Sequence, residues 1–523
     1  MAATLPRELL YMIAEHLHHN GVSLVPYATV CRLWQPVFES FIFSTMTVHS
    51  GNRSASDQNK APGQKGMSLA QFKEATSGSK TTRRAYIRAL QYDVLVPFEI
   101  LDWTTSKRAG YTTHNPVRRA NDEAFEAAIT SLFQILSSWD YCYHISLEIG
   151  LLGCQQGRVL EPLTRYNSEA GEYGYDYRNG RTKSVPPYRA RFAGASALPS
   201  ISCVNKLTFD NRRYRESKYY QDWVNSDDEE ETADTRPRNR WHQIWAGAIF
   251  YIAQHCITLN ELYMDLNEFV RPDHLQYIKE RRAAVAEGIR ALLTSIRILN
   301  YKGQQEYPWT ETQSALNILK TEADTLATNL QTISFILREL RLSNISLSMD
   351  FLWPLDAHDK PIANSAYHWP HLQVLTLDAV PAILPSGQWL AAPEPEDQEA
   401  IDNISDWEDE ICDLERGVVN RHVLDIEQFH RLFISWGHAA RHQMPLIRSM
   451  MFHLDNVSDI RFTFLVGKGG EAGATLDWDS DSPYPYRPDQ SVASAWGFDL
   501  NSLKMEWDNR FSATLPQWPP GAW

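Results

Sequence analysis

Apolar residues near the N-terminus recur at three- and four-residue steps, which is the spacing of one face of an α-helix. In the stretch LPRELLYMIAEHL, residues 5–17, the residues at these steps are Leu9, Leu10, Ile13, Ala14 and Leu17. Pro6 suits the first turn of such a helix, because the N–H group that proline lacks has no intrahelical partner there. Asn20 and Gly21 tolerate a positive φ and predict the end of this helix.

Two shorter apolar sets follow, over residues 24–30 and 33–43, and the second is rich in aromatic residues. The chain then turns polar in GNRSASDQNKAPGQKG, residues 51–66, which offers almost nothing to a hydrophobic core. We therefore expect a three-helix module over residues 1–50 and a flexible linker over residues 51–80. Units of about 40 residues rarely fold without a metal, a disulfide or a partner. The module is therefore expected to pack on another surface, either the body of its own protein or a second chain.

Short runs of alternating apolar residues predict β-strands throughout the remaining body, residues 81–510. They lie at 89–96, 144–152, 204–211, 259–267, 337–348, 371–380 and 447–456. Several contain an L-x-x-L-x-L pattern, as in Leu337, Leu340 and Leu342, which is typical of a leucine-rich repeat strand. The strands are spaced more widely than the ~20–29 residues of regular repeats, so either helices and loops are inserted or the body is an unrelated α/β domain. Helical stripes that can be placed between the strands lie at residues 125–136, 273–299 and 322–337.

Three polar segments interrupt the body and are predicted to be exposed loops, near residues 166–188, 226–240 and 387–415. The first is rich in Gly, Tyr and Arg, and the second begins with acidic SDDEEE and then turns basic. The third carries many acidic residues and neither Lys nor Arg. As an alternative to simple solvated loops, these segments would form an acidic surface for a basic partner, or a phosphorylation site near Ser226.

The composition argues against several classes of function. The hydrophobic fraction of 43% and the charged fraction of 22% are those of an ordinary globular protein. A formal net charge of -14 argues against nucleic acid as a partner, because such binding depends on clustered Lys and Arg. The six cysteines lie far apart without a CxxC pair, so we expect reduced thiols. No apolar run reaches the roughly 18 residues that span a bilayer, and acidic residues and histidines interrupt any N-terminal signal sequence. We therefore expect no membrane association and a cytoplasmic or nuclear location.

No motif in the sequence predicts a catalytic residue, a cofactor or a metal. The stretch IRFTFLVGKGGEA, residues 460–472, approaches a dinucleotide-binding fingerprint, but the residues after it are too rich in Asp, Ser and Pro to begin the required helix. We interpret it as a glycine turn between two strands. His438 and His442 stand one helical turn apart, as zinc ligands do, but neither an HExxH glutamate nor a third ligand at fixed spacing accompanies them in the sequence.

The N-terminal residues follow the order L-P-x-E-L-L, then I, L, VCRxW, F and IF, over residues 4–48. This order resembles an F-box, although the stretch HHNGVS, residues 18–23, is longer than in many relatives. The resemblance implies a helical module that docks on the Skp-family adaptor of a cullin–RING ubiquitin ligase. It assigns this role, without dividing adaptor contacts from helix-packing contacts, to Leu5, Pro6, Leu9, Leu10, Ile13, Val30, Cys31 and Trp34.

The body is similar to that of fungal F-box proteins with degenerate leucine-rich repeats. We therefore expect an α/β fold, with a small N-terminal three-helix F-box followed by an irregular leucine-rich-repeat-like α/β solenoid. The function that the resemblance implies is that of a substrate-recognition subunit, not an enzyme, in a Skp–cullin–F-box ubiquitin ligase. Such a subunit binds the adaptor, and through it a cullin, and presents a target protein for ubiquitination.

Two other functions stay open at the level of sequence. One is an F-box interaction protein that acts outside the ligase. The other is a soluble enzyme whose N-terminal helices only cap its own core, because catalytic residues need not be contiguous. A cap predicts that Leu9, Ile13 and Trp34 are enclosed by later parts of the chain, whereas docking predicts that an apolar face stays open.

Overall fold

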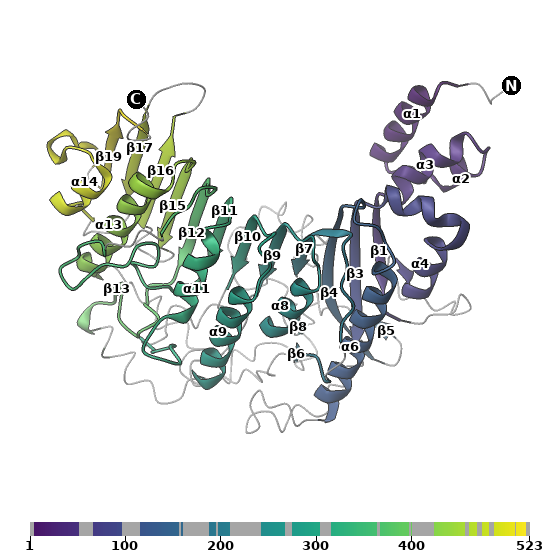
Figure 1. Cartoon of the computed structure of the whole chain (residues 1–523), viewed down its shortest axis with the longest axis horizontal. Helices are drawn as coiled ribbons and strands as arrows, with labels where there is room; N and C mark the ends of the chain where they lie inside the picture. Colours follow the sequence, from purple (N-terminus) through teal and green to yellow (C-terminus); the bar gives the residue numbers. More distant parts are fainter. Residues whose placement is uncertain are drawn as a thin grey trace, which may run out of the picture. The chain divides into compact units, whose positions relative to one another are not determined.

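The computed structural model describes residues 5–51, 66–96, 116–155, 158–159, 188–194, 197–209, 242–266, 275–303, 315–362, 367–396, 399, 423–454, 460–467, 473–480, 486–507 and 509–518. These residues form two compact units. The first contains the described residues up to Tyr263, and the second contains those from Met264 onward. Each unit is mixed α/β, with helices on one face of a mostly parallel sheet (Figure 1).

The first unit begins with the three helices that the apolar pattern predicts, namely α1 (Arg7–His19), α2 (Val25–Ala28) and α3 (Trp34–Ile42). Pro6 directly precedes α1, and Gly21 lies after its end with a φ of 68°. The three helices share a small core of buried side chains: Leu10, Ala14, Leu24, Val37 and Phe38.

The sheet of the first unit is parallel and runs in the order β2 (Met67–Ser68), β1 (Thr45–His49), β3 (Ala89–Val96), β4 (Ile145–Gln155) and β7 (Val204–Phe209). Strand β9 (Glu261–Asp265) follows β7 in this order. Side chains alternate along β3, where Leu90, Tyr92 and Val94 are buried and the residues between them are half-exposed. Helices α6 (Pro116–Leu136) and α8 (Ala246–Gln254) lie on one face of this sheet (Figure 1). Smaller elements complete the unit: β5 (Arg158–Val159) pairs with β4, and β6 (Tyr188–Ala190) pairs with β8 (His242–Ile244).

The prediction of a flexible linker over residues 51–80 is wrong in its C-terminal part. Residues 52–65 lie outside the described residues, but α4 (Leu69–Ala75) and the 3-10 helix η2 (Gly78–Tyr86) follow β2 directly. Helix α4 forms because the Ser68 hydroxyl accepts a hydrogen bond from the Gln71 amide, while the Gln71 side chain accepts one from the Ser68 amide. Leu69 and Phe72 are buried on its inner face.

The second unit contains a run of parallel strands in which each strand pairs with the next strand of the same sheet along the chain. Their order is β10 (Ile298–Lys302), β11 (Glu339–Ser343), β12 (Val374–Val380) and β15 (Ser449–Leu454). Three helices, α9 (Leu275–Arg290), α11 (Thr325–Ser334) and α13 (Ile426–Gln443), lie on one face of these strands (Figure 1).

The pairing becomes antiparallel after β15. The added strands, in sheet order, are β16 (Ile460–Val466), β17 (Ala474–Asp479), β19 (Arg510–Leu515) and β18 (Lys504–Trp507). Helix α14 (Gln490–Trp496) packs against α13. Strands β16 and β17 are antiparallel neighbours, with Val466 opposite Ala474 and the Gly467 amide donating to the Gly473 carbonyl. The residues between Gly467 and Gly473, where the glycine turn is predicted, lie outside the described residues.

The structure confirms all seven predicted strand segments and the coarse class, a mixed α/β fold with a large, mostly parallel sheet. The predicted helices at 125–136 and 322–337 correspond to α6 and α11. The stripe over residues 273–299 was predicted too long, because α9 ends at Arg290 and Ile298 begins β10. The final residues of that stripe pair with β11 instead of continuing the helix.

The acidic segment near residues 387–415 is not an exposed loop at its start. Leu390 and Ala391 are fully buried, and β13 (Ala391–Ala392) pairs with β14 (Val423–Leu424). Gly387 has a φ of 84° and approaches Asn317 so closely that a Cβ would lie 2.8 Å from the Asn317 amide nitrogen. Residues 400–415 of this segment, the predicted loop at 226–240, and residues 166–187 of the first predicted loop lie outside the described residues, while Tyr188 begins β6.

Candidate docking surface

Helix α1 has a buried side and an open apolar side. Leu10 and Ala14, four residues apart, are buried in the core of the three helices. The α1 apolar face consists of Leu5, just before the helix, and Leu9, Met12 and Ile13 on it, with exposed fractions of 41%, 44%, 64% and 36%. Leu9 and Ile13 follow each other at a four-residue step, so these side chains form a stripe along the helix.

A second group of exposed apolar side chains surrounds α2 and the start of α3. It comprises Val22, Val25, Val30 and Leu33, with exposed fractions of 42%, 58%, 53% and 61%. Together with the α1 apolar face, it holds eight of the sixteen large apolar side chains that are exposed in the described part of the chain. Single exposed apolar residues are normal, whereas concentrations of them are typical of surfaces that bind another molecule.

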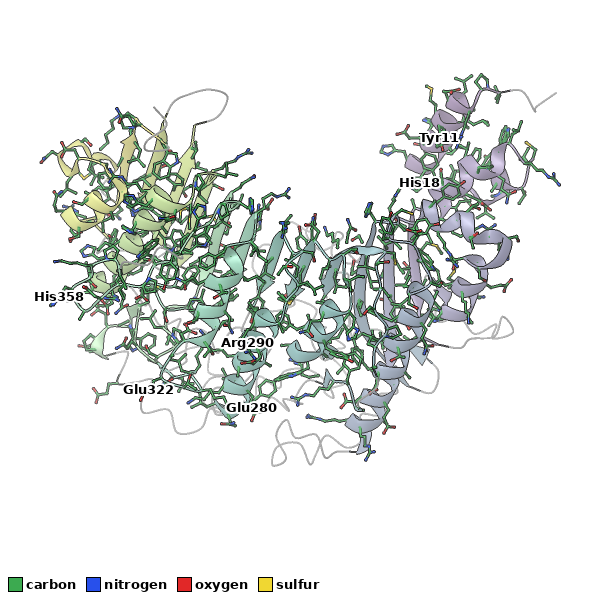
Figure 2. All side chains as sticks on the ribbon, in the orientation of Figure 1. Tyr11, His18, Glu280, Arg290, Glu322 and His358 are labelled. Atoms are coloured by element: carbon green, nitrogen blue, oxygen red, sulfur yellow. The ribbon has the colours of Figure 1, made fainter. Side chains whose placement is uncertain are left out.

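Aromatic stacking holds the three helices together without using these exposed residues. The Phe38 ring of α3 stacks on Tyr27 of α2 and on Trp34 of α3, at centroid distances of 5.5 and 5.4 Å. Tyr11 and His18 project from the other side of α1 towards Phe41, at 6.1 and 5.9 Å (Figure 2). The core of the three helices is therefore closed by their own residues while the α1 apolar face stays open.

The three helices join the rest of the first unit through α3. The carboxylate of Glu39, buried to 8% exposure, accepts hydrogen bonds from Arg83 in η2 at 2.5 Å and from Gln35 at 3.0 Å. The Arg83 guanidinium also lies 4.9 Å from the centroid of the Phe43 ring. Burial, and then the nearby Glu39 charge, raise the pKa of the Tyr86 hydroxyl. The attachment runs through α3 and η2, and Leu9, Met12 and Ile13 of α1 stay exposed.

The structure separates the eight residues that the F-box resemblance selects. Five of them are exposed: Leu5, Pro6, Leu9, Ile13 and Val30. Leu10 lies in the core, while Cys31 and Trp34 are half-buried, with the Trp34 ring stacked on Phe38. On α1, Leu9 and Ile13 are therefore open while Leu10 packs inward, and adaptor binding by the open residues stays a prediction.

Four residues of the exposed set were missed from the sequence: Met12, Val22, Val25 and Leu33. Met12 has a usable signal, because it stands three residues after Leu9 on the same helical face. Leu33 belongs to an apolar run whose other members turn inward, so the pattern alone does not show that it points outward.

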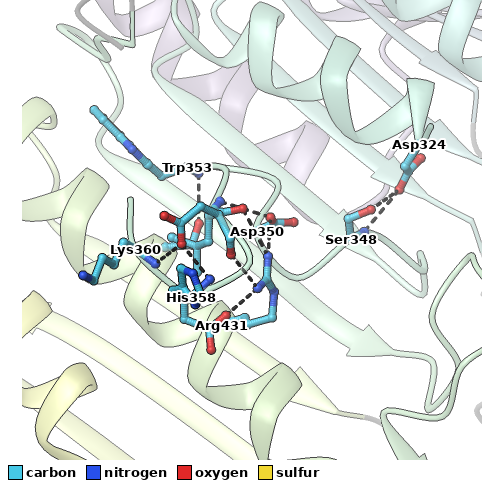
Figure 3. A network of polar contacts seen from close by, with 11 residues as sticks. Asp324, Ser348, Asp350, Trp353, His358, Lys360 and Arg431 are labelled. Carbon is cyan, nitrogen blue, oxygen red and sulfur yellow. Dashed lines mark hydrogen bonds and ion pairs between the residues drawn. The ribbon is translucent and has the colours of Figure 1, made fainter. Parts of the chain in front are cut away.

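In the second unit, a network of charged groups holds a loop in place (Figure 3). Arg431 of α13 donates to Asp350 at 3.0 Å and to Asp359, and both acceptors lie in the connection between β11 and β12. The amides of His358 and Lys360 donate to the Asp356 carboxylate and lower its pKa. The network ties this connection to α13, and the Ser348 hydroxyl, which also lies in the connection, donates to the Asp324 carboxylate at 3.1 Å.

His438 and His442 lie on one side of α13 with ring centroids 4.7 Å apart. Burial lowers the pKa of His438 to about 4, and it also lowers that of His442. The His438 ring contacts the edge of Trp353, at 4.5 Å between centroids. The described residues contain no group of three or more His, Cys, Asp and Glu side chains that could hold a metal ion. His438 is half-buried, whereas His442 is exposed.

Among the described helices, none combines the length and the apolar character that crossing a lipid bilayer requires. No protein-family model, no curated protein and no solved structure matches this chain. The function is therefore proposed from the residues and geometry given above.

Proposed function

We propose that this protein is the substrate-recognition subunit of a Skp–cullin–F-box ubiquitin ligase. Its N-terminal helices dock on a Skp-family adaptor, and its body binds a target protein. The observation that carries the proposal is the α1 apolar face, which stays open on a three-helix unit whose own core is already closed. This is what docking on a second chain requires and what a cap on the protein's own core does not.

The order of the strands supports a leucine-rich-repeat-like body. Successive strands β10, β11, β12 and β15 pair in parallel, with a register shift between Leu377 and Val380 in the last pair and with helices on one face. The inward residues of the L-x-x-L-x-L runs are buried, as Leu337, Leu340 and Leu342 show. The uneven connections and the antiparallel C-terminal strands distinguish it from a regular repeat array.

In this proposal the protein acts through proximity and carries out no chemistry itself. Holding a target lysine beside the ubiquitin-charged enzyme of the ligase raises the effective concentration of the two reactants. We propose a cytoplasmic or nuclear location for this assembly, which agrees with the free thiols of Cys31, Cys142, Cys203 and Cys256.

Capture by a purified Skp-family adaptor tests the proposal. We expect wild-type protein to co-purify with the adaptor, and Leu9→Asp to lower the affinity at least about ten-fold, because a carboxylate would be buried against an apolar partner. Leu9 is exposed in the free protein, so the melting temperature should not change. Ile257→Asp is the matched control, since Ile257 is also exposed but lies outside the three helices.

Failure of the wild-type protein to bind the adaptor would overturn the proposal, and so would an equal loss for both variants. Recovery of a cullin with the adaptor, together with ubiquitination of a bound target, separates the ligase subunit from an F-box protein that acts outside the ligase.

A further inference from the structure

Four residues of the second unit stand at the same level, one position before four neighbouring strands. They are Arg297, Arg338, Gln373 and Arg448, which precede β10, β11, β12 and β15. Backbone hydrogen bonds fix this alignment: Arg338 N–H donates to the Arg297 carbonyl at 2.7 Å, Gln373 to Arg338 at 2.8 Å, and Arg448 to Gln373 at 2.9 Å. Since neighbouring strands are about 4.8 Å apart, Arg297 and Arg448 are separated by about 14 Å.

The three arginines of this row are exposed, and so is Arg341, which lies two residues after Glu339 on β11. Arg338 and Arg341 both pair with the Glu339 carboxylate, at 3.3 and 3.1 Å. The side chain of Arg448 forms no hydrogen bond or ion pair with other described residues. Four arginines and one glutamate give these N-terminal strand ends a local charge of 4 − 1 = +3, although the whole chain carries −14.

Exposed leucines flank the end of the row. Leu446, two residues before Arg448, has 48% of its surface exposed, and Leu465 of β16 has 45%. Leu465 lies opposite Ser449, and the neighbouring Val466 amide donates to the Arg448 carbonyl at 2.9 Å. Apolar contact area is therefore available directly beside the last arginine.

We propose that these N-terminal strand ends bind an extended acidic segment of another protein, and that this segment carries an apolar residue next to its carboxylates. Arginine forks bind carboxylates through paired, charge-assisted hydrogen bonds. Carboxylates at alternate positions of an extended chain lie about 6.7 Å apart, so three of them span about 13 Å, close to the length of the arginine row. The exposed ion pairs with Glu339 are weak, and an incoming carboxylate can replace them.

The inference identifies the chemistry of a target, and its link to ubiquitination rests on the proposed function. The binding itself does not depend on adaptor docking, so it is measured on the full-length protein without the adaptor. Loss of adaptor capture and loss of acidic-peptide binding are therefore distinguishable results.

Fluorescence anisotropy with a labelled peptide that alternates Glu and Ser tests the inference. We expect saturable binding that weakens with salt, and no comparable binding of a peptide that alternates Gln and Ser. The double variant Arg338→Gln/Arg448→Gln should bind at least about ten-fold more weakly, since it loses two charge-assisted contacts. Arg297→Gln should weaken binding in the same direction.

Arg119→Gln serves as the matched control, because Arg119 is an exposed arginine of α6 outside the row, paired with Glu123. It should bind the acidic peptide within about two-fold of the wild type. Absence of binding to the acidic peptide, equal binding of the Gln–Ser peptide, or equal loss in the control would overturn the inference. Tighter binding of a single-stranded RNA at the same row would overturn it as well. Unchanged melting temperatures of the variants exclude unfolding as the cause of a loss.

Discussion

At the scale of single residues, the carboxylate of Glu39 connects the three N-terminal helices to the rest of the first unit. It is largely removed from water and receives hydrogen bonds from Arg83 and Gln35. Removing one partner of a buried ion pair costs more than the pair contributes, because the remaining charge stays poorly solvated. The attachment of α3 to η2 should therefore depend on Arg83.

We expect Arg83→Met to lower the free energy of unfolding by about 1–3 kcal/mol, because Glu39 keeps only Gln35 as a partner. Chemical denaturation measures this change, and hydrogen exchange should become faster in α3. Lys80→Met is the control in the same 3-10 helix, since it removes an exposed ion pair with Glu74. It should change stability by less than about 0.5 kcal/mol. Equal effects of the two substitutions would contradict the role given to Glu39.

The sequence predicted the three helices but not which of their residues are buried. Leu9 and Leu10 are adjacent and chemically identical, yet Leu10 is buried and Leu9 is exposed. The rotation of α1 about its axis decides between them, and that rotation depends on packing against Val37 and Phe38 of another helix. Spacing within one helix does not contain this information.

At the scale of elements, close packing of α14 on α13 depends on a glycine inside a helix. A Cβ at Gly437 would lie 2.7 Å from Cδ1 of Trp496, whose ring is buried and whose Nε1 donates to the Phe433 carbonyl at 2.9 Å. The ring is held by this hydrogen bond and has little room to move.

We expect Gly437→Ala to lower the free energy of unfolding by about 1–2 kcal/mol, since overpacking costs more than the higher helix propensity of alanine returns. Thermal or denaturant unfolding measures the effect. Ser494→Ala, at an exposed position of α14, should stay within about 0.5 kcal/mol of the wild type. A Gly437→Ala variant that is as stable as the wild type would show that the two helices can separate without cost.

The strands were predictable because alternation decides which residues face the core: Leu340 and Leu342 are buried, as their pattern indicates. The linker was predicted too long because its polar composition outweighed a local signal, the capping pair Ser68 and Gln71. The antiparallel end of the sheet was not predicted. Strand direction depends on which strands pair, and β16 alone does not reveal its neighbours.

For the whole molecule, the proposals assign two tasks to separate surfaces. The α1 apolar face, in the first unit, binds an adaptor, and the arginine row, in the second unit, binds an acidic segment of a target. The α1 apolar face belongs to three helices that have a core of their own, whereas the arginine row is charged and lies at the ends of strands. Each can therefore be disabled without the other.

Hydroxyl-radical labelling of the full-length protein, alone and with a Skp-family adaptor, tests the docking claim most directly. Met12 and Met505 are both well exposed, at 64% and 62%, so the radicals should oxidise both in the free protein. With the adaptor present, oxidation of Met12 should fall several-fold while that of Met505 stays unchanged. Undiminished oxidation of Met12 in the presence of saturating adaptor would contradict docking through the α1 apolar face.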